Sequence, residues 1–183
     1  MGRAQSLFPP LLGSYAWDLF ITGWEGLRAH AQTYRALYTE ADDRQGKLTD
    51  SNNLQYTFDF LTLEELDYLH GLLNAPQVKK GLSSQLESLG DANQYTEASW
   101  IVQVLGNLVD YACITAEDEV MWEMDINIFL VEETSATENY THRAACTSFA
   151  RRLCGWLPQQ TLGSLLFCMR MIFNNGSSEY DFR

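Results

Sequence analysis

Basic side chains are missing from a long internal part of this sequence. The 183 residues carry 12 Lys and Arg against 24 Asp and Glu, a formal net charge of −12 at pH 7. No Lys or Arg stands from position 81 to position 142, and that interval holds twelve of the acids. Because the rest of the chain has equal numbers of acids and bases, the whole net charge belongs to this interval. Its field repels phosphate and anionic lipid, argues against direct nucleic-acid and membrane binding, and favours basic partners.

Metal-binding and disulfide patterns are also missing. The four cysteines show neither C-x-x-C pairing nor a histidine at zinc-finger spacing, and we expect them to be buried thiols in a reducing compartment: Cys113, Cys146, Cys154 and Cys168. The three histidines are far apart in sequence. Glu138 and His142 are four positions apart and could share a helix face. A solvated ion pair or hydrogen bond between them is favoured over a metal site.

Sequence signatures of catalysis and of membrane insertion are absent as well. The chain has no G-x-x-x-x-G-K-[ST], G-x-G-x-x-G or G-x-S-x-G motif. It has no apolar run near the roughly 18 residues that span a bilayer. We therefore expect no catalytic, cofactor-binding or metal-binding residue. A compact all-helical enzyme with a carboxylate site remains the less favoured alternative.

What the sequence does have is helical periodicity. Hydrophobic residues make up 46% of the chain, enough for a folded core. Apolar residues recur at helical spacing in five segments, with no convincing strand alternation: 7–38, 54–73, 76–89, 100–114 and 158–173. A sixth helix is expected over 139–156. Helices arriving in pairs with a period near roughly 40 residues predict an all-α fold, an α-solenoid of HEAT-type antiparallel pairs with roughly three to four repeats. A single helical bundle is the alternative.

The expected organisation is one array without a domain boundary. It comprises a first helix, straight or kinked, a loop, central helices, an acidic insert with its loop, a helix pair and a truncated tail: 1–40, 41–53, 54–114, 115–138, 139–174 and 175–183.

The acidic insert opens with Thr115-Ala116-Glu117-Asp118, which has the spacing of a capping box at a helix start. Its acids can serve helix initiation, a partner surface, or both. The apolar residues Trp122, Ile126, Phe129 and Leu130 recur at helical steps and are expected to close a core, although an aromatic ring among acids could also anchor a basic side chain. The acids that form the candidate surface for a basic partner are Glu117, Asp118, Glu119, Glu123, Asp125, Glu132, Glu133 and Glu138.

An ordered motif runs through this region. Its first part is T-x-E-[DE]-x-x-x-W-x-x-[DN]-x-x-x-[FY], which is matched by Thr115, Glu117, Asp118, Trp122, Asp125 and Phe129. An acidic pair follows, Glu132 and Glu133. The last part is Y-[ST]-x-R-x-A, which is matched by Tyr140, Thr141, Arg143 and Ala145. This order resembles the middle repeats of importin-β-type nuclear transport receptors, or karyopherins. The importin nine branch and its fungal counterpart are the most similar, also in the FPP and TEADD stretches near the start. The resemblance is strong from 100 to 173 and weak from 81 to 96.

The resemblance implies a HEAT-repeat import receptor that shuttles between cytoplasm and nucleus. Its implied cargo is basic: core histone dimers, with a histone-chaperone role, ribosomal proteins and the TATA-binding protein. Control by Ran bound to GTP and contact with nucleoporins are implied too. Such receptors are far longer than this chain, so we expect a middle-repeat fragment, with Ran bound mostly elsewhere. A HEAT-repeat scaffold or an export receptor outside this branch is the alternative.

Overall fold

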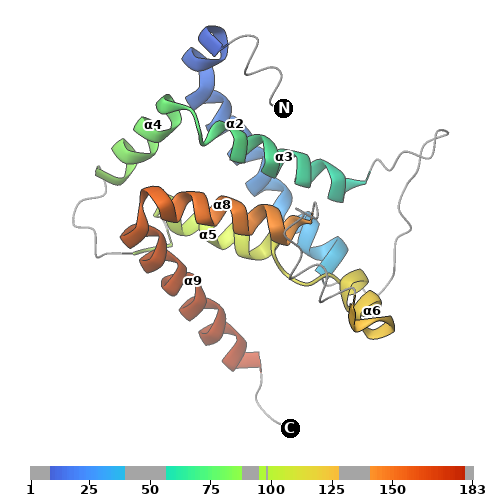
Figure 1. Ribbon diagram of the computed structural model, residues 1–183. Helices are drawn as coiled ribbons and strands as arrows, with labels where there is room; N and C mark the ends of the chain where they lie inside the picture. Colours follow the sequence, from blue (N-terminus) through green and yellow to red (C-terminus); the bar gives the residue numbers. More distant parts are fainter. Residues whose placement is uncertain (1–8, 40–56, 88–94, 98, 128–140, 180–183) are drawn as a thin grey trace, which may run out of the picture.

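The computed structural model describes residues 9–39, 57–87, 95–97, 99–127 and 141–179 (Figure 1). These residues form helices, and no strand occurs among them. In chain order the elements are α2 (Pro9–Tyr34), the π-helical turn η1 (Arg35–Thr39), α3 (Phe58–Leu72), α4 (Pro76–Glu87), α5 (Trp100–Tyr111), α6 (Ala116–Met124), α8 (His142–Trp156) and α9 (Pro158–Glu179). Each predicted helix is present within a few residues of its expected bounds. The expected loops at 41–53 and 132–138 lie outside the described residues.

Local sequence explains where several helices begin. Threonines at positions 57, 115 and 141 precede α3, α6 and α8, and each hydroxyl accepts a hydrogen bond from a backbone amide of the first turn. Such caps satisfy amides that have no partner within the helix. Pro76 and Pro158 are the first residues of α4 and α9, where the missing amide proton costs nothing. The chain therefore breaks briefly between α3 and α4, and again between α8 and α9.

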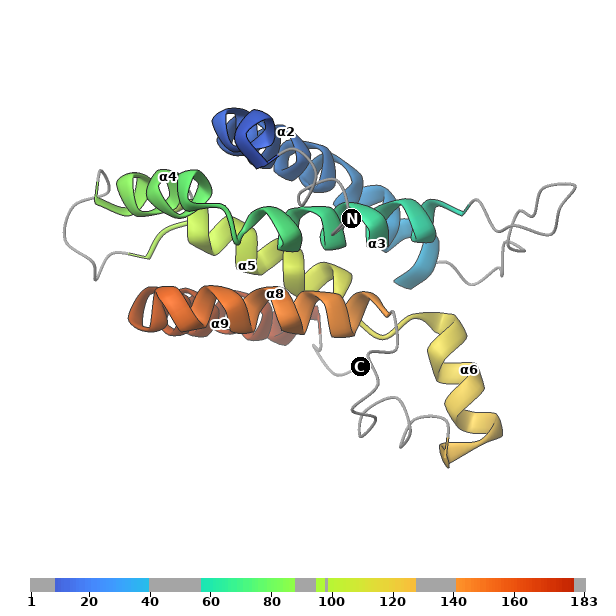
Figure 2. The same cartoon turned by 45° about the horizontal axis from the view of Figure 1, so that its top comes forward.

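The helices stack in two layers. One layer holds α2, α5 and α9, which contact one another in that order. The other holds α3, with α4 continuing it, and α8. Figure 2 shows α2 uppermost in the stack, α3 and α4 at about one height below it, then α5, and α8 with α9 lowest. The helices form two pairs. In the first, α2 packs on α3 and its continuation α4; in the second, α5 packs on α8. Helix α9 follows the second pair.

Side-chain contacts fix the direction of each helix. Along α2, Gly23 lies beside Leu69 and His30 beside Phe58, so α2 and α3 run antiparallel across the layers. Within a layer the helices run parallel. In α3 and α8, Thr62 contacts His142, and His70 lies beside Phe149 further along both helices. Antiparallel pairs with parallel stacking between pairs confirm the predicted all-α, HEAT-type solenoid.

The core runs between the two layers, with α5 in the middle of the stack. Six of its residues are buried against neighbours on both layers: Ile101, Val102, Val104, Leu105, Leu108 and Tyr111. Apolar residues of α2, α3, α4 and α8 complete this core, among them Phe20, Leu69, Leu82 and Phe149. The prediction that α5 is buried on a wide face is confirmed.

A glycine permits one close approach in the core. The Trp17 ring of α2 lies where a side chain at Gly81 of α4 would begin. Any larger residue at position 81 would have to push this ring away. Gly81 therefore sets how closely α4 packs on α2.

The far side of α9 is exposed. The predicted apolar stripe is helical as expected, but four of its members are solvent-accessible: Leu162, Leu166, Met169 and Phe173. In this structure no neighbouring helix covers that face as α8 and α9 cover α5. Among the described helices, none combines the length and hydropathy needed to cross a bilayer.

Candidate functional site

The acidic insert departs from the stack as the short helix α6. Both views place α6 at the edge of the molecule, beyond the end of α5 (Figures 1 and 2). It contacts η1, the turn that ends the first helix. The insert is therefore a side branch between α5 and α8, the two helices of one pair.

The predicted capping box at the start of α6 is confirmed. The Asp118 amide donates to Thr115 Oγ1 at 3.2 Å, and the Thr115 amide donates to Asp118 Oδ2 at 3.1 Å. The reciprocal bonds satisfy two backbone donors, and the Asp118 carboxylate lies at the positive end of the helix dipole. Asp118 is thus occupied in holding the helix start.

The other candidate acids divide into exposed and undescribed residues. The side chains of Glu119, Glu123 and Asp125 are exposed on or beside α6. The Asp125 Oδ1 oxygen accepts two bonds from Asn127, from its backbone amide at 2.9 Å and from Nδ2 at 2.8 Å. Glu117 belongs to α6, but its side chain lies outside the described set, as do all atoms of Glu132, Glu133 and Glu138. The described part of the surface therefore consists of three exposed carboxylates.

The expectation that the apolar residues of the insert close a core is wrong for Ile126. Ile126 is 60% exposed, and its neighbour Met124 is 82% exposed. Phe129 and Leu130 lie outside the described residues. Trp122 is half-buried, and the Arg143 guanidinium of α8 lies over its ring, 4.8 Å from the centroid. Ile126 is exposed because α6 projects from the stack. Helical spacing predicts which residues share a face, but it does not predict whether another helix covers that face.

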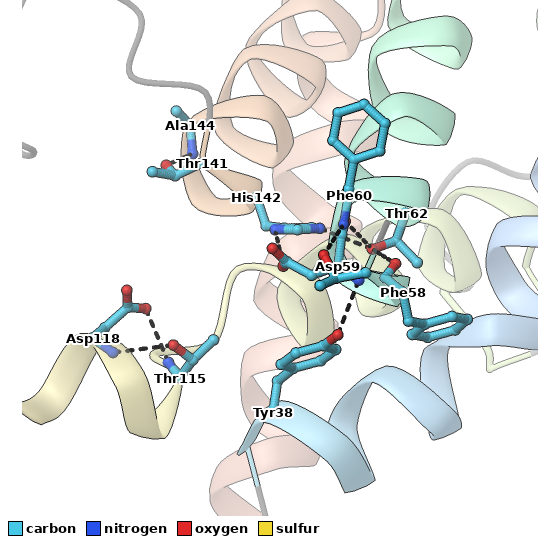
Figure 3. Close-up of polar contacts among 11 residues, drawn as sticks. Tyr38, Phe58, Asp59, Phe60, Thr62, Thr115, Asp118, Thr141, His142 and Ala144 are labelled. Carbon is cyan, nitrogen blue, oxygen red and sulfur yellow. Dashed lines mark hydrogen bonds and ion pairs between the residues drawn. The ribbon is translucent and has the colours of Figure 1, made fainter. Parts of the chain in front are cut away.

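A buried polar cluster lies beside the base of α6 (Figure 3). His142, at the start of α8, is 8% exposed. Its Nε2 lies 2.9 Å from Thr62 Oγ1, and its Nδ1 lies 3.2 Å from Asp59 Oδ1. Thr62 Oγ1 also lies within hydrogen-bond distance of the carbonyl oxygens of Phe58 and Asp59, and the Asp59 amide donates to Tyr38 OH. These bonds connect α3, α8 and η1.

The prediction that His142 makes a solvated contact with Glu138 is therefore wrong, because His142 is buried and bonds to α3. Both ring nitrogens of His142 face α3 and already have partners there. Glu138 itself lies outside the described residues. The helical spacing of the two residues could not reveal that α3, about 80 positions earlier, supplies the partners.

Two tyrosines enclose this cluster. The rings of Tyr34 and Tyr111 lie with centroids 4.8 Å apart, and each also faces the imidazole of His142. The Tyr111 hydroxyl donates to the Leu27 carbonyl oxygen at 2.7 Å, which ties α5 to α2. No sequence motif marked these residues, because only the fold brings them together.

Burial governs the ionisation of the cluster. It raises the pKa of Tyr34 and Tyr111, and nearby carboxylates act in the same direction. It lowers the pKa of His142, and the adjacent Asp59 carboxylate opposes this effect. Asp118 of α6 also contributes to the electrostatics of Tyr34 and His142, so the base of the insert lies close to the cluster.

The cysteines follow the prediction only in part. Cys146 and Cys168 are buried, and burial raises the pKa of both thiols. Cys113 is half-buried and Cys154 is exposed, so the expectation of four buried thiols is wrong. Cys154 shares a helix with Cys146, eight positions earlier, but that spacing turns the two side chains far enough apart for one to reach solvent. Within the part of the chain that the structure describes, no group of three His, Cys, Asp or Glu side chains could hold a metal ion.

Comparison with known proteins gives one match. Residues 95–183 match the family model described as "Importin-9 central HEAT repeats". The matched range includes α5, α6, α8 and α9, and therefore the second helix pair and the acidic insert. The match supports an importin-β-type HEAT-repeat protein, in agreement with the resemblance of the motif. Neither the curated proteins nor the solved structures that were searched contain a match.

Proposed function

We propose that this chain is part of a nuclear import receptor of the importin nine branch, shared by its fungal counterpart, and that its acidic insert contacts basic protein cargo. The cargo classes are core histone dimers, ribosomal proteins and the TATA-binding protein. Ran bound to GTP controls cargo binding, mostly through repeats outside this chain, and the receptor shuttles between cytoplasm and nucleus. We propose residues 115–138 as the cargo-contacting unit of a single array.

One observation carries this proposal: the exposed carboxylates of the insert stand on a helix that projects from the stack. Glu119, Glu123 and Asp125 are exposed on α6, and no Lys or Arg occurs in the 62 positions from 81 to 142. The insert has no base of its own, and Arg143 of α8 brings one positive charge to its Trp122 ring, so the insert keeps a net negative charge. Such a field steers a basic protein toward the insert and fixes its orientation there.

The arrangement supports binding rather than catalysis. The matched family consists of non-enzymatic transport receptors. The carboxylates of Glu119, Glu123 and Asp125 are exposed to solvent, whereas catalytic carboxylates usually work in enclosed sites that exclude water. A HEAT-repeat scaffold or an export receptor remains the second candidate, because the acidic insert would serve either with a basic partner.

The test is binding to a core histone dimer. We expect affinity to fall with added salt, and to fall about tenfold in the triple variant Glu119→Gln, Glu123→Gln and Asp125→Asn, if each exposed contact contributes about 0.5 kcal/mol. Asp118 is left unchanged, since its loss would remove the capping box and destabilise α6. Isothermal titration calorimetry at several salt concentrations measures both effects.

A charge-matched control separates position from net charge. The triple variant Asp18→Asn, Glu25→Gln and Glu64→Gln removes three exposed carboxylates from α2 and α3. It should leave dimer affinity within about twofold of the wild type, because its charges lie away from the insert. Equal losses in both triple variants would mean that only net charge matters, and the insert would not be the cargo site.

The undescribed acids and the Ran dependence need their own variants. Substituting Glu117, Glu132, Glu133 and Glu138 with Gln tests whether they extend the same surface. A change in dimer affinity on adding Ran bound to GTP to a receptor that contains this chain tests the regulatory part. An unchanged affinity would favour the scaffold alternative.

A further inference from the structure

The Trp122 ring already holds a guanidinium. Arg143 of α8 lies 4.8 Å from the ring centroid, within the range of a cation–π contact. Trp122 is half-buried, yet it is absent from the half-buried apolar side chains that pack on the core of the described chain. Its ring therefore contacts the stack through Arg143, at the junction of α6 and α8, and is not part of the apolar core.

Acidic residues precede and follow Trp122 along α6. Asp118 and Glu119 precede Trp122 by four and three positions, so they share its helix face. Asp125 follows by three positions and caps the helix. Of these carboxylates, Glu119 is exposed on the helix face of Trp122, while Asp118 is held in the capping box and Asp125 lies just past the last turn.

Exposed apolar groups continue the same end of α6. Met124 and Ile126 are 82% and 60% exposed, beside the exposed carboxylates Glu123 and Asp125. We call the set Glu119, Trp122, Glu123, Met124, Asp125 and Ile126 the insert face; it wraps around the C-terminal end of α6, since Trp122 and Met124, two positions apart, point to different sides of the helix. A face that combines apolar and acidic groups complements a segment that combines apolar and basic groups.

We propose that the insert face binds an arginine-bearing segment of a protein partner, and that a guanidinium of this segment takes the place of Arg143 on the Trp122 ring. The inference rests on the proposed function, since it names the chemistry by which the same surface selects its basic partner. Arg143 represents the contact that the partner makes. Met124 and Ile126 pack against apolar side chains of the bound segment.

This geometry prefers arginine to lysine. A guanidinium is planar, stacks on an indole and can bind a carboxylate with two parallel hydrogen bonds, and it is less strongly hydrated than an ammonium. General attraction to an acidic surface would depend only on charge, and would treat the two residues alike. A preference for arginine at equal charge is therefore the property that distinguishes the ring contact.

The experiment compares two peptides of identical length, charge and apolar residues, one with arginine and one with lysine at every basic position. We expect the arginine peptide to bind the wild-type chain roughly threefold to tenfold more tightly. Trp122→Leu should abolish this preference while leaving the affinity of the lysine peptide within about twofold. Fluorescence anisotropy of labelled peptides provides the affinities, and circular dichroism verifies the helical content of each variant.

Trp156→Leu is the matched control. Trp156 is also half-buried and also carries a cation, with Lys79 Nζ 4.3 Å from its ring centroid, but it lies at the opposite end of α8 from Arg143. This variant should retain the preference for arginine. Arg143→Leu vacates the Trp122 ring and should increase the preference further.

The outcomes separate the two proposals. Equal binding of both peptides to the wild type overturns this inference and leaves the proposed function standing. Binding of neither peptide contradicts the proposed function itself. A preference that persists in Trp122→Leu, or that falls in Arg143→Leu, shows that the ring is not the exchangeable guanidinium site.

Discussion

The stack and the insert use similar sequence patterns with opposite results. On α5, residues at helical spacing such as Leu105 and Leu108 are buried because α2, α8 and α9 surround them. On and beside α6, Met124 and Ile126 are exposed, although the segment has comparable apolar spacing. Periodicity tells which residues share a face of a helix. Whether that face is buried depends on a second helix, and among the described helices none covers the exposed side of α6.

Two consecutive residues of α8 join these regions. His142 points into the stack and bonds to α3, while Arg143 lies over Trp122 of the insert. Thr141 precedes them and caps the helix, with its Oγ1 accepting from the Ala144 amide at 3.2 Å. The first turn of α8 therefore belongs to both regions, and perturbing it from either side tells how independent they are.

The largest expected effect comes from the stack. Leu105→Ala removes a fully buried side chain from the central helix and should lower the free energy of unfolding by about 2 to 5 kcal/mol, through lost burial and the cavity left behind. Chemical denaturation followed by circular dichroism measures it. Leu162→Ala on the exposed face of α9 is the control, with an expected change within about 0.5 kcal/mol. Similar losses in the two variants would contradict the assignment of the core.

A smaller effect tests whether α6 unfolds independently. Thr115→Ala removes the capping box and should destabilise α6 by about 1 kcal/mol, so its amides should exchange with solvent about fivefold faster. The unfolding midpoint of the stack should not change, because α6 contributes little to the core. Thr57→Ala removes the matching cap of α3, a helix of the stack, and should lower that midpoint. If Thr115→Ala lowers it as much, the insert is not a separate unit.

The smallest effect is a pH dependence of the stack. Burial lowers the pKa of His142, so the unfolded chain binds more protons than the folded chain between the folded value and the ordinary value of about 6.5. This contribution to stability is present above about 6.5 and is lost as the pH falls below it. Asp59 opposes the shift, which keeps the effect small.

His142→Gln isolates this contribution. Glutamine retains hydrogen-bonding groups but does not titrate, so the free energy of unfolding should fall less between pH 7.5 and 5.5 in the variant than in the wild type. Urea denaturation at the two pH values provides the comparison. An identical fall in both proteins would show that the carboxylates alone determine the acid sensitivity.

Much of the stack could be predicted from the sequence because its signals are local. Pro76 and Pro158 mark helix starts, and the spacing of Thr115 and Asp118 marks a capping box, irrespective of the rest of the fold. The layered arrangement followed from helices arriving in pairs. Prediction worked where a residue and its partner are at most a few turns apart.

Contacts between distant segments could not be predicted. His142 meets Thr62 across 80 positions, and Arg143 meets Trp122 across an undescribed segment. The motif that suggested the family contains Trp122, Thr141 and Arg143. The order of these residues in the sequence does not reveal that Arg143 contacts the Trp122 ring. Local spacing assigned His142 to Glu138 and Ile126 to a core, and in both cases the position of another helix decided otherwise.

The Thr62 hydroxyl gives the interior a way to accommodate a proton. When His142 is neutral with its hydrogen on Nδ1, the hydroxyl can donate to Nε2 while Nδ1 donates to Asp59. When the ring gains a second hydrogen, Nε2 can donate to Thr62 Oγ1, and the hydroxyl can turn to the Asp59 carbonyl oxygen, 2.9 Å away. Rotation about a single C–O bond therefore completes the hydrogen bonding of both ionisation states. Helices α3 and α8 can keep their register through a protonation event, which then costs only the desolvation of a charge beside a carboxylate.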